Sequence, residues 1–549
     1  MIAARDYHRH LRLGLCLLLA SAFALLAWKL RFVQDDAFIS FRYARNWVDG
    51  LGLVFNPGER VQGYTNFLWV LMSAVPIAFD AAIVPAIHYV SLAFFFVSVV
   101  IAFALYAQLF RSTLVAGCLV IMHFSNPSLL AYATGGLETA LLNCLLELSL
   151  LLAVLVSRNP GDRTCAGLLS LSLSLLGLTR LDSALFIACI LAFATLSVLQ
   201  SGECRARKYS TLLAMYLPGV IVLSGYFAWC FWYYGDILPN TFHAKAASST
   251  PGLMKQGFDY VWSFLYGYGY AAILLAGFVF IRTLYRDRFF FFVFIALLLW
   301  IAYVIKVGGD FMEYRFMVPA IPLFVLVFGR VVHSLARAQP RRQSLFAAVG
   351  CAMFVGLFLT HAPVLPEGVE SIASLDLREQ DIEKNWIGIG RQLRVAFSGA
   401  AYQPKIAVTA AGAIPYYSGL PCVDMHGLND RWIGRHGPSH GNRPGHMKHA
   451  TADYLAASGV DMLIGHPFSI PSPPPGPFPG RICRQIFDAG LDSIGPETDA
   501  LFAASAVYGL HVGWNHELLF VVLPNAAIAA HIQDIPGIRL LQHGLPFCQ

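Results

Sequence analysis

Long apolar stretches alternate with short polar loops along the first two thirds of the chain, and they predict membrane-spanning helices. The apolar runs of helix length lie at about residues 11–30, 66–84, 86–109, 113–131, 139–157, 165–178, 183–199, 211–233, 268–282, 288–306, 316–335 and 344–361. A helix needs about 20 apolar residues to cross a bilayer, so some of these runs are short or merged. We therefore expect a polytopic α-helical membrane protein with about 11–13 transmembrane helices.

The pattern changes after about residue 361. Residues 471–480 (PSPPPGPFPG) and the charged stretches of this region cannot span a bilayer. Apolar runs of strand length, separated by helix-like pieces, lie at residues 405–409, 460–464 and 518–523. This alternation is typical of α/β-type domains. We predict a transmembrane domain over residues 1–361 and a water-facing α/β-type domain over residues 362–549, which is long enough to bury its own core.

Composition supports the membrane class and excludes others. Of the 549 residues, 57% are hydrophobic and only 13% are charged, whereas soluble proteins average about 25% charged residues. The net charge of +6 is small, and the basic residues lie in short loops. Membrane lipids are therefore the expected partners, and nucleic acid is not. Eleven cysteines show no metal-ligand spacing, and a disulfide between two of Cys422, Cys483 and Cys548 is left open.

Lysine and arginine in the loops predict the orientation. The basic loops lie at residues 158–163, 205–208, 282–288 and 337–342. Such loops stay in the cytoplasm, so the intervening loops and everything after about residue 361 face the outside. The first run ends in Lys29 and Arg31 without a cleavage site, which predicts an uncleaved helix that starts in the cytoplasm. With the N-terminus in the cytoplasm, the number of apolar runs before residue 158 is one too many to place the loop at 158–163 in the cytoplasm. One run between residues 66 and 130 must therefore be re-entrant, interfacial or split.

A polar interval at residues 31–66 is the first outer loop and the centre of the candidate chemistry. Asp35 and Asp36 fall near the lipid headgroups, where ionised groups are costly unless they have a function or a partner. Arg42 can meet a phosphate. The aromatic and amide side chains of this loop that suit a sugar or an acceptor are Tyr43, Asn46, Tyr64 and Asn66.

The other outer loops also carry acids and bases close to membrane boundaries. These candidate residues are Glu138, Arg180, Asp182, Lys245, Asp310 and Arg315. Arginine and lysine bind phosphate, and a carboxylate takes a proton from an incoming hydroxyl. The set predicts glycosyl transfer from a phosphosugar that is anchored in lipid. A polyprenyl-phosphate sugar is the expected donor, because a nucleotide sugar is implausible outside the cytoplasm.

Each candidate receives a role as a hypothesis. Asp35 or Asp36 is the catalytic base or electrostatic stabiliser. The residues expected to hold the donor phosphate are Arg42, Arg180, Lys245 and Arg315. The residues expected to contact the sugar or the acceptor are Tyr43, Asn46, Tyr64, Asn66, Glu138, Asp182 and Asp310. No metal ligand and no cofactor is predicted, and a divalent metal is left open.

Simpler interpretations exist for most of these residues. Asp35 and Asp36 can cap the helix that begins near Ala37. Arg42 can share a solvated, salt-bridged helix face with Arg45 and Asp49. The remaining alternatives are interface anchoring for Tyr64 and Trp69, an isolated charge at a helix terminus for Glu138, and a tight turn for Asp310 after Gly308 and Gly309.

Histidines of the last domain offer a weak metal signal. His436 and His440 are spaced as zinc ligands on a helix, but Gly437 and Pro438 break the helix that such a site needs. Solvated loop residues are the preferred interpretation of the histidines in this region, which are His426, His436, His440, His446, His449 and His466.

Several motifs resemble those of GT-C membrane glycosyltransferases. In the first outer loop they are residues 35–46 (DDAFISFRYARN), 50–56 (GLGLVFN) and 63–69 (GYTNFLW). The likeness is greatest to the terminal β-(1→2)-arabinofuranosyltransferases of the mycobacterial cell wall and related bacterial proteins, among them a type IV pilin arabinosyltransferase. Residues 238–245, 309–315, 414–421 and 424–430 are similar to further motifs of that group.

This resemblance implies a multi-helix GT-C fold with a periplasmic C-terminal domain in a bacterial inner membrane. It implies a polyprenyl-phosphate arabinofuranose donor, an envelope glycan or a pilin-like protein as acceptor, and a catalytic aspartate that matches Asp35 or Asp36. The chain departs from the group at Gln62, at His243 and at residues 179–183. These departures bear on the identity of the sugar more than on the reaction class.

Two other classes of function remain as alternatives. A transporter or flippase of a lipid-linked sugar tends to carry ionisable groups at mid-membrane and inverted repeats. In this chain the predicted charges gather at one face, and no repeat is visible. A non-enzymatic assembly partner that displays the C-terminal domain would have no use for the charged first loop.

Overall fold

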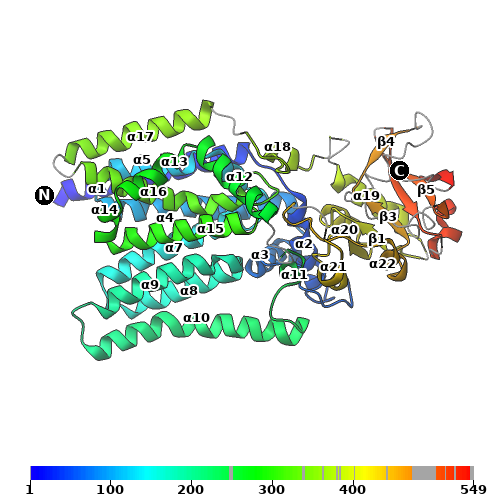
Figure 1. The fold of residues 1–549 in the computed structure, drawn as a ribbon, viewed down its shortest axis with the longest axis horizontal. Coiled ribbons are helices and arrows are strands. Elements are labelled where there is room, and N and C mark those ends of the chain that lie inside the picture. The colour runs from blue at the N-terminus through cyan, green and yellow to red at the C-terminus, as the bar shows by residue number, and fades with distance from the viewer. Residues whose placement is uncertain are drawn as a thin grey trace.

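The computed structural model describes residues 2–245, 251–336, 340–360, 364–378, 381, 385–400, 402–439, 443–472, 503–513, 515–524 and 527–543. A bundle of helices forms one part, and a mixed part of helices and a sheet follows at one end of it (Figure 1). This arrangement confirms a polytopic helical protein with a C-terminal α/β-type region.

Long apolar helices build the bundle. They are α1 (Ile2–Lys29), α4 (Ile83–Phe110), α7 (Thr139–Arg158), α9 (Ala184–Leu199), α10 (Arg205–Tyr234), α15 (Arg288–Lys306), α16 (Ile321–Leu335) and α17 (Pro340–Thr360). The shorter helices are α2 (Asp35–Val48), α3 (Phe67–Ala78), α5 (Thr113–Phe124), α6 (Pro127–Tyr132), α8 (Arg163–Thr179), η1 (Leu181–Ser183), α11 (Asn240–Lys245), α12 (Pro251–Gly267), α13 (Tyr270–Val279), α14 (Ile281–Arg286) and η2 (Arg315–Ala320).

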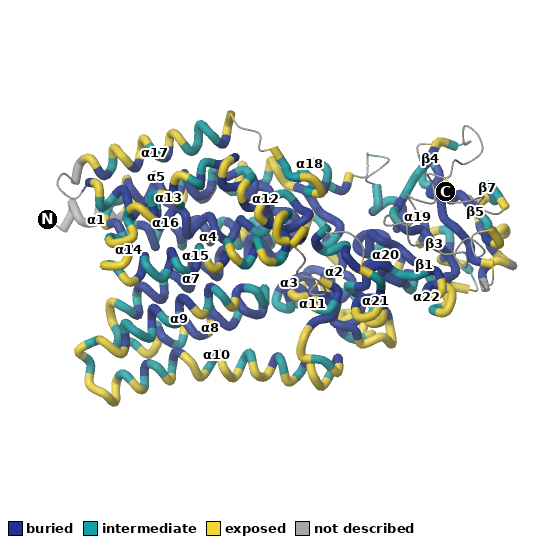
Figure 2. The backbone as a smooth tube through the Cα atoms, viewed as in Figure 1, coloured by how far each residue is buried: buried dark blue, intermediate teal, exposed yellow. Residues whose placement is uncertain are grey.

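Length and apolarity allow eight spans in the described part of the chain, or nine if α12 and α13, bent by 92°, form one. The shorter apolar helices of the described chain are α3, α5 and α8, and the predicted total of 11–13 exceeds the eight or nine spans. The helices differ in burial: α7 and α16 are largely buried, whereas α10 exposes most of its length (Figure 2). An apolar helix exposed in this way is suited to face lipid.

Helix α3 accounts for the one surplus apolar run in the predicted topology. Helix α4 begins beside the end of α1, where Trp28 stacks on Tyr89 and the ring of His88 bonds to the carbonyl oxygen of Phe32 at 3.0 Å. The chain therefore enters and leaves α3 at the same end of the bundle. Helix α3 has 12 residues, about 18 Å, which is too short to cross a hydrocarbon core of about 30 Å. The run at 66–84 is thus the re-entrant or interfacial one.

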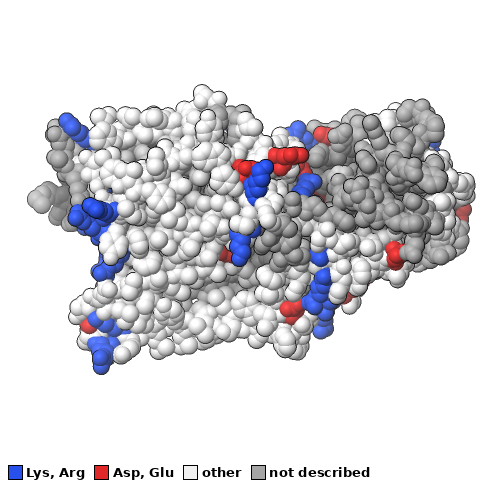
Figure 3. Space-filling view, viewed as in Figure 1, with Lys and Arg blue, Asp and Glu red and all other residues white. Residues whose placement is uncertain are grey.

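Basic residues gather at the end of the bundle opposite the sheet (Figure 3). There Arg158, at the end of α7, donates to the carbonyl oxygen of Gln108 at 2.6 Å. The loops predicted to lie outside meet at the other end. The separation of the two kinds of loop agrees with the sequence-based topology, and which end faces the cytoplasm stays a prediction.

The C-terminal part folds around one sheet. Its helices are α18 (Ile372–Leu375), α19 (Trp386–Phe397), α20 (Ala413–Ser418), α21 (Arg431–His436), α22 (Ala452–Ala457), η4 (Ala527–Ala530) and η5 (Ile532–Asp534). Its strands are β1 (Ile406–Val408), β2 (Cys422–Asp424), β3 (Met462–Gly465), β4 (Ser469–Pro471), β5 (Ala506–Gly513), β6 (His516–Val522) and β7 (Ile538–His543). The strand order is β2-β1-β3-β6-β5-β7, and β4 also pairs with β6. Strand β1 is parallel to β2 and β3, and the other pairings are antiparallel.

Strands β1, β3 and β6 coincide with the three runs predicted from the sequence. The register of the parallel pair joins Ile406 to Cys422 and Val408 to Asp424. All residues of β1 and β2 are buried, as expected for strands covered on both faces. The parallel edge of the sheet therefore packs towards the bundle with α20 and α21 beside it (Figure 1).

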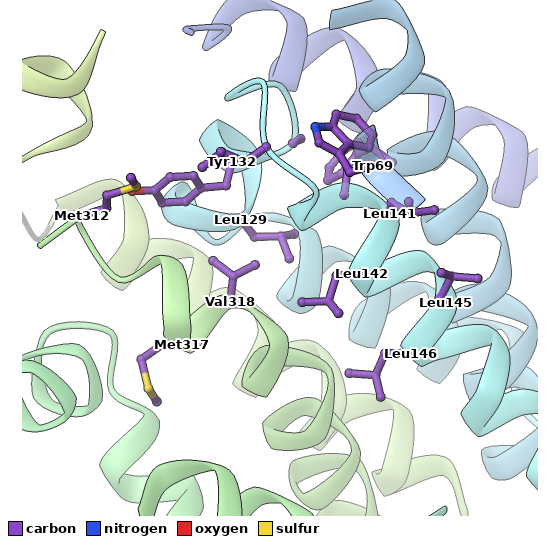
Figure 4. Packing of buried hydrophobic residues seen from close by; sticks show 14 of the residues in the cluster. Trp69, Leu129, Tyr132, Leu141, Leu142, Leu145, Leu146, Met312, Met317 and Val318 are labelled. Atoms are coloured by element: carbon purple, nitrogen blue, oxygen red, sulfur yellow. The ribbon is translucent and has the colours of Figure 1, made fainter. Parts of the chain in front are cut away.

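Buried apolar side chains connect α7, η2 and the first outer loop inside the bundle. Val318 of η2 lies beside Leu142 of α7, and Leu146 follows one turn later on α7 (Figure 4). Trp69 is fully buried and donates from its indole nitrogen to the carbonyl oxygen of Gly136 at 2.9 Å. Its interpretation as an interface anchor is therefore wrong, because its ring is part of the core.

Candidate active site

A cavity of about 610 Å³ lies between the C-terminal part and the end of the bundle that adjoins it. Its charged lining residues are Arg180, Asp182, Lys245, Lys306 and Asp310. Its apolar wall includes Leu238, Phe242, Leu253, Phe311 and Phe316, and the C-terminal part contributes Pro444, Gly445 and Met447. Charged residues on one side and an apolar wall on the other suit a polar headgroup that is attached to a lipid chain.

One charged group of the cavity is centred on Arg180, which follows α8. Its Nε and Nη2 donate to the two oxygens of Asp182 at 3.0 and 2.5 Å, and its Nη1 donates to Glu138 Oε1 at 3.2 Å. The other oxygen of Glu138 accepts from Asn66 Nδ2 at 2.9 Å. Glu138 is therefore not an isolated terminal charge, and Asn66 connects the first outer loop to this group.

A second pair forms in the loop before η2. Arg315 Nε donates to Asp310 Oδ2 at 2.6 Å, and both side chains are buried. Gly308 and Gly309 precede Asp310 with φ of 86° and 78°. A Cβ on Gly309 would lie 2.7 Å from the ring of Tyr260, so only glycine fits this turn. The tight turn predicted as the simpler alternative is present, and it also delivers Asp310 to Arg315.

Asp35 and Asp36 face different partners. The oxygens of Asp35 accept from the backbone amides of Gly412 and Ala413 at 3.0 and 2.8 Å, at the start of α20. Burial raises the pKa of Asp35 to about 7, against the lowering effect of these bonds. Asp35 therefore binds the C-terminal part. Capping of their own helix is the wrong interpretation, because Gln34 is the N-cap residue of α2 and makes no side-chain cap bond.

Asp36 is not part of the cavity lining, but it interacts electrostatically with Lys245 and Asp310, which line the cavity, and with Arg315. Burial raises the pKa of Asp36, and the nearby cations Arg315 and Lys245 oppose that rise. Desolvation lowers the pKa of Lys245, an effect that Arg315 strengthens and Asp36 opposes. Within the described residues no carboxylate lies at ion-pair distance from Lys245, so its ammonium group is available to an anion in the cavity.

Arg42 was expected at the donor phosphate but lies outside the cavity. Its guanidinium donates to the carbonyl oxygen of Phe55 at 2.7 Å, to that of Leu420 at 2.8 Å, to that of Pro415 and to Asn56 Oδ1 at 3.1 Å. It is buried, so the solvated helix face was also the wrong interpretation. Arg42 joins the first outer loop to α20, through Pro415, and to the residues just after α20, through Leu420.

The remaining candidates of the first outer loop hold that loop together. The hydroxyl of Tyr43 donates to the carbonyl oxygen of Val61 at 2.7 Å. Asn46 Nδ2 donates to the carbonyl oxygen of Val54 at 2.8 Å. The hydroxyl of Tyr64 bonds to that of Tyr234 at 3.0 Å, and the Tyr64 ring is buried away from any interface. None of the three lines the cavity.

Sequence reasoning missed two residues and one segment of the cavity. Lys306 ends α15 and lines the cavity, and Tyr303, one turn earlier, donates to Asp182 Oδ2 at 3.4 Å. A lysine at the end of an apolar run, just before the Gly-Gly-Asp turn, was a usable signal for Lys306. Residues 444–447 carried no such signal, because their place depends on the fold of the C-terminal part.

Two buried histidines, His426 and His449, form a cluster with the half-buried His446. The ring of His426 lies 4.7 Å from that of His446 and 5.1 Å from that of His449, between centroids. The expectation of solvated loop residues is wrong for His426 and His449, which are buried. His436 is exposed, and His440 lies outside the described residues. Where the chain is described, no group of histidine, cysteine or acidic residues is placed to hold a metal ion.

The predicted disulfide has no partner pair in the described part of the chain. Cys422 is a buried free cysteine of β2. Cys483 and Cys548 lie outside the described residues, so the prediction remains open.

Comparison with known proteins gives one family model and two curated relatives. A model described as a domain of unknown function (DUF8728) matches residues 376–501. The chain is 28% identical over 356 residues to a terminal beta-(1->2)-arabinofuranosyltransferase of Corynebacterium glutamicum, covering 57% of this chain and 50% of that protein. It is 27% identical over 252 residues to the terminal beta-(1->2)-arabinofuranosyltransferase of Mycobacterium tuberculosis, covering 43% of this chain and 38% of that protein. The alignments thus span half or less of the relatives' length.

Two solved structures of an Archaeoglobus fulgidus oligosaccharyltransferase also align with the chain. One is AglB in complex with an inhibitory peptide and a dolichol-phosphate, with 12% identity and a TM-score of 0.48 over 98% of this chain and 77% of that chain. The other is a complex with zinc and sulfate, with 10% identity and a TM-score of 0.42 over 74% of this chain and 62% of that chain. Both scores are below 0.5, so neither likeness bears on function.

Proposed function

We propose that this chain is a membrane glycosyltransferase of GT-C type that transfers a sugar, arabinofuranose, from a polyprenyl-phosphate donor to an extracytoplasmic glycan or pilin-like acceptor. It works in a bacterial inner membrane with the cavity and the C-terminal part outside the cytoplasm. The observation that carries the proposal is a cavity with one apolar wall that is lined by Lys245 and by Asp310, which pairs with Arg315. Asp36 interacts electrostatically with all three of these residues. The similarity to two arabinofuranosyltransferases supports the choice of sugar.

In the proposed reaction Asp36 takes the proton of an acceptor hydroxyl. The acceptor oxygen bonds to the anomeric carbon, and the bond from that carbon to the phosphate oxygen breaks. Lys245, backed by Arg315, stabilises the charge that develops on the leaving phosphate. The raised pKa of Asp36 suits this role, because a base works best when its pKa approaches the working pH.

The other charged groups orient substrates in this proposal. Arg180 is committed through all three nitrogens to Glu138 and Asp182, so it presents these carboxylates and adds positive charge behind the phosphate. Carboxylates held in this way accept hydrogen bonds from sugar hydroxyls. Asp310 is held by Arg315 for the same purpose.

Replacing Asp36 tests the proposal. We expect Asp36→Asn to lower transfer from a synthetic polyprenyl-phosphate arabinofuranose in membranes by about 10²–10⁴-fold, since a positioned base contributes this much. Asp49→Asn is the matched control, because Asp49 is an exposed carboxylate at the other end of α2, and it should keep wild-type activity. Activity of Asp36→Asn within a few-fold of wild type would contradict the assignment.

A flippase of the lipid-linked sugar is the second candidate, and one observation favours it. His123 and Glu147 are fully buried inside the bundle, with Nε2 and Oε1 3.6 Å apart, and Glu147 also accepts from Ser98 at 2.7 Å. Buried ionisable groups within a membrane bundle are typical of transporters. Movement of the donor lipid across vesicles containing the purified protein, without formation of a glycosidic bond, would favour this function.

A further inference from the structure

The first outer loop is fastened to the C-terminal part by side chains that bind backbone. Asp35 accepts from both amides at the start of α20, and Arg42 donates to the carbonyl oxygens of Pro415 and Leu420 near its end. Asn56 bonds to both backbone groups of Cys422 in β2, at 2.8 and 3.0 Å. All these groups are buried, so the contacts fix α2 against α20 without competition from water.

The segment that carries Lys245 is fastened in the same way. Asn240, the first residue of α11, donates from Nδ2 to the carbonyl oxygens of Gly427 at 2.8 Å and Asp430 at 2.9 Å. A Cβ on Gly434 would lie 2.8 Å from this Nδ2, so the two segments are in close contact. A helix of six residues is not stable alone, and α11 therefore owes its place to this contact.

The loop with Asp310 and Arg315 is the third segment. The amide of Glu370 donates to the carbonyl oxygen of Phe311 at 2.7 Å, and the amide of Glu313 donates to the carbonyl oxygen of Glu370 at 3.0 Å. Glu370 belongs to the chain after α17. The three segments that carry Asp36, Lys245, and Asp310 with Arg315 are thus each tied to residues beyond the helical bundle.

We infer that the C-terminal part is the frame of the active site, and that Asp35 and Asn240 are positioning residues for Asp36 and Lys245. Asp35 is the chain neighbour of Asp36, and Asn240 and Lys245 are the two ends of one short helix. Loss of either contact moves a reacting group and leaves the substrates' other contacts in place. The inference rests on the proposed function for its kinetic form. The alternative role is a C-terminal part that only presents the acceptor. In that role it would affect the KM for the acceptor and leave kcat unchanged.

Kinetics of full-length variants separate the frame from an acceptor-binding module. We expect Asp35→Asn and Asn240→Ala to lower kcat by about 10²-fold, the effect of a displacement of about 1 Å in a reacting group. The KM for the acceptor should stay near that of wild type. Arg435→Gln is the control, because Arg435 pairs with Asp236 across the same boundary at an exposed site. An unchanged kcat, or a rise in the acceptor KM alone, would overturn the inference.

A second readout does not depend on the reaction. Acylation of Lys245 by an amine reagent, measured by mass spectrometry on the full-length protein in detergent, should change several-fold in Asn240→Ala and stay at the wild-type rate in Arg435→Gln. If the wild-type protein shows no transfer activity but the labelling changes in Asn240→Ala, the proposed function is refuted. The inferred positioning role of the C-terminal part is then still supported. Normal transfer that depends on Asp36, with unaltered kcat and labelling in both positioning variants, refutes the frame alone.

Stability controls keep the test open to refutation. Asp35→Glu keeps the charge but lengthens the side chain, and Asn240→Gln does the same for the amide. Thermal unfolding in detergent identifies any variant that fails to fold. Only variants that fold are used to test the inference. In these variants the longer side chain at residue 35 or 240 should lower kcat.

Discussion

Asp35 and Asp36 have different surroundings because consecutive residues of a helix point about 100° apart. Asp35 reaches the amides of Gly412 and Ala413, 377 and 378 residues away along the chain. Asp36 turns to Lys245 and Arg315. The sequence places the pair at a membrane boundary, where two ionised carboxylates are energetically costly unless they have a function or a partner. It does not say which one is the base, because their distant partners decide this.

Asp35 should make stability depend on pH. Its pKa is about 7 in the folded protein against an ordinary value of 3.8, so the folded state binds the proton more tightly. The stability from this group is complete below about pH 4 and is lost as the pH rises through about 7. We expect the melting temperature to fall between pH 5.5 and 8, with a smaller slope in Asp35→Asn.

The buried carboxyl of Asp424, whose pKa burial raises to about 6, contributes a slope of the same sign. That contribution should persist in Asp35→Asn and serves as the internal reference. Equal slopes in the wild type and the variant, measured by thermal unfolding over this pH range, would show that Asp35 does not titrate there.

At the scale of elements, bilayer thickness makes apolar runs easy to recognise, and most of the helices lie where the sequence predicts them. Helix α12 (Pro251–Gly267) is the exception, since it lies between the predicted apolar runs at 211–233 and 268–282. Lys255 and Asp259 interrupt its apolar pattern, and the hydrophobic run becomes visible only near α13. The bend between them falls at Gly269, with φ of 71°, a conformation that favours glycine.

The contact between α2 and α20 depends on the absence of one side chain. A Cβ on Gly412 would lie 2.0 Å from the carbonyl oxygen of Asp35, so Gly412→Ala must push the two helices apart. We expect a loss of about 1–3 kcal/mol in the free energy of unfolding, the usual effect of overpacking, together with lower transfer activity. Gly399→Ala is the control, because nothing lies within 4 Å of a Cβ there. Equal stability of both variants by thermal unfolding would refute the close contact.

At the scale of the whole molecule, the candidate site joins segments that lie far apart in the sequence. Residue type identified most members, since acids and cations are rare in so apolar a chain. Residue type did not reveal where each side chain points. Arg42 binds carbonyl oxygens of the C-terminal part, whereas Lys245 lines the cavity. Arg42, the arginine closest in sequence to the paired aspartates, therefore has a structural role. The cations that line the cavity are Arg180 after α8, Lys245 of α11 and Lys306 of α15.

Orientation in the membrane is the remaining property of the whole molecule, and Cys204 reports on it. Cys204 is exposed and precedes α10 at the basic end of the bundle. Basic loops stay in the cytoplasm, so a membrane-impermeant thiol reagent should label Cys204 only after spheroplasts are permeabilised. Val395→Cys, at an exposed position of α19, should be labelled in intact spheroplasts. The reverse pattern, mapped by mass spectrometry, would place the cavity in the cytoplasm, where a polyprenyl-phosphate donor would no longer be required by location.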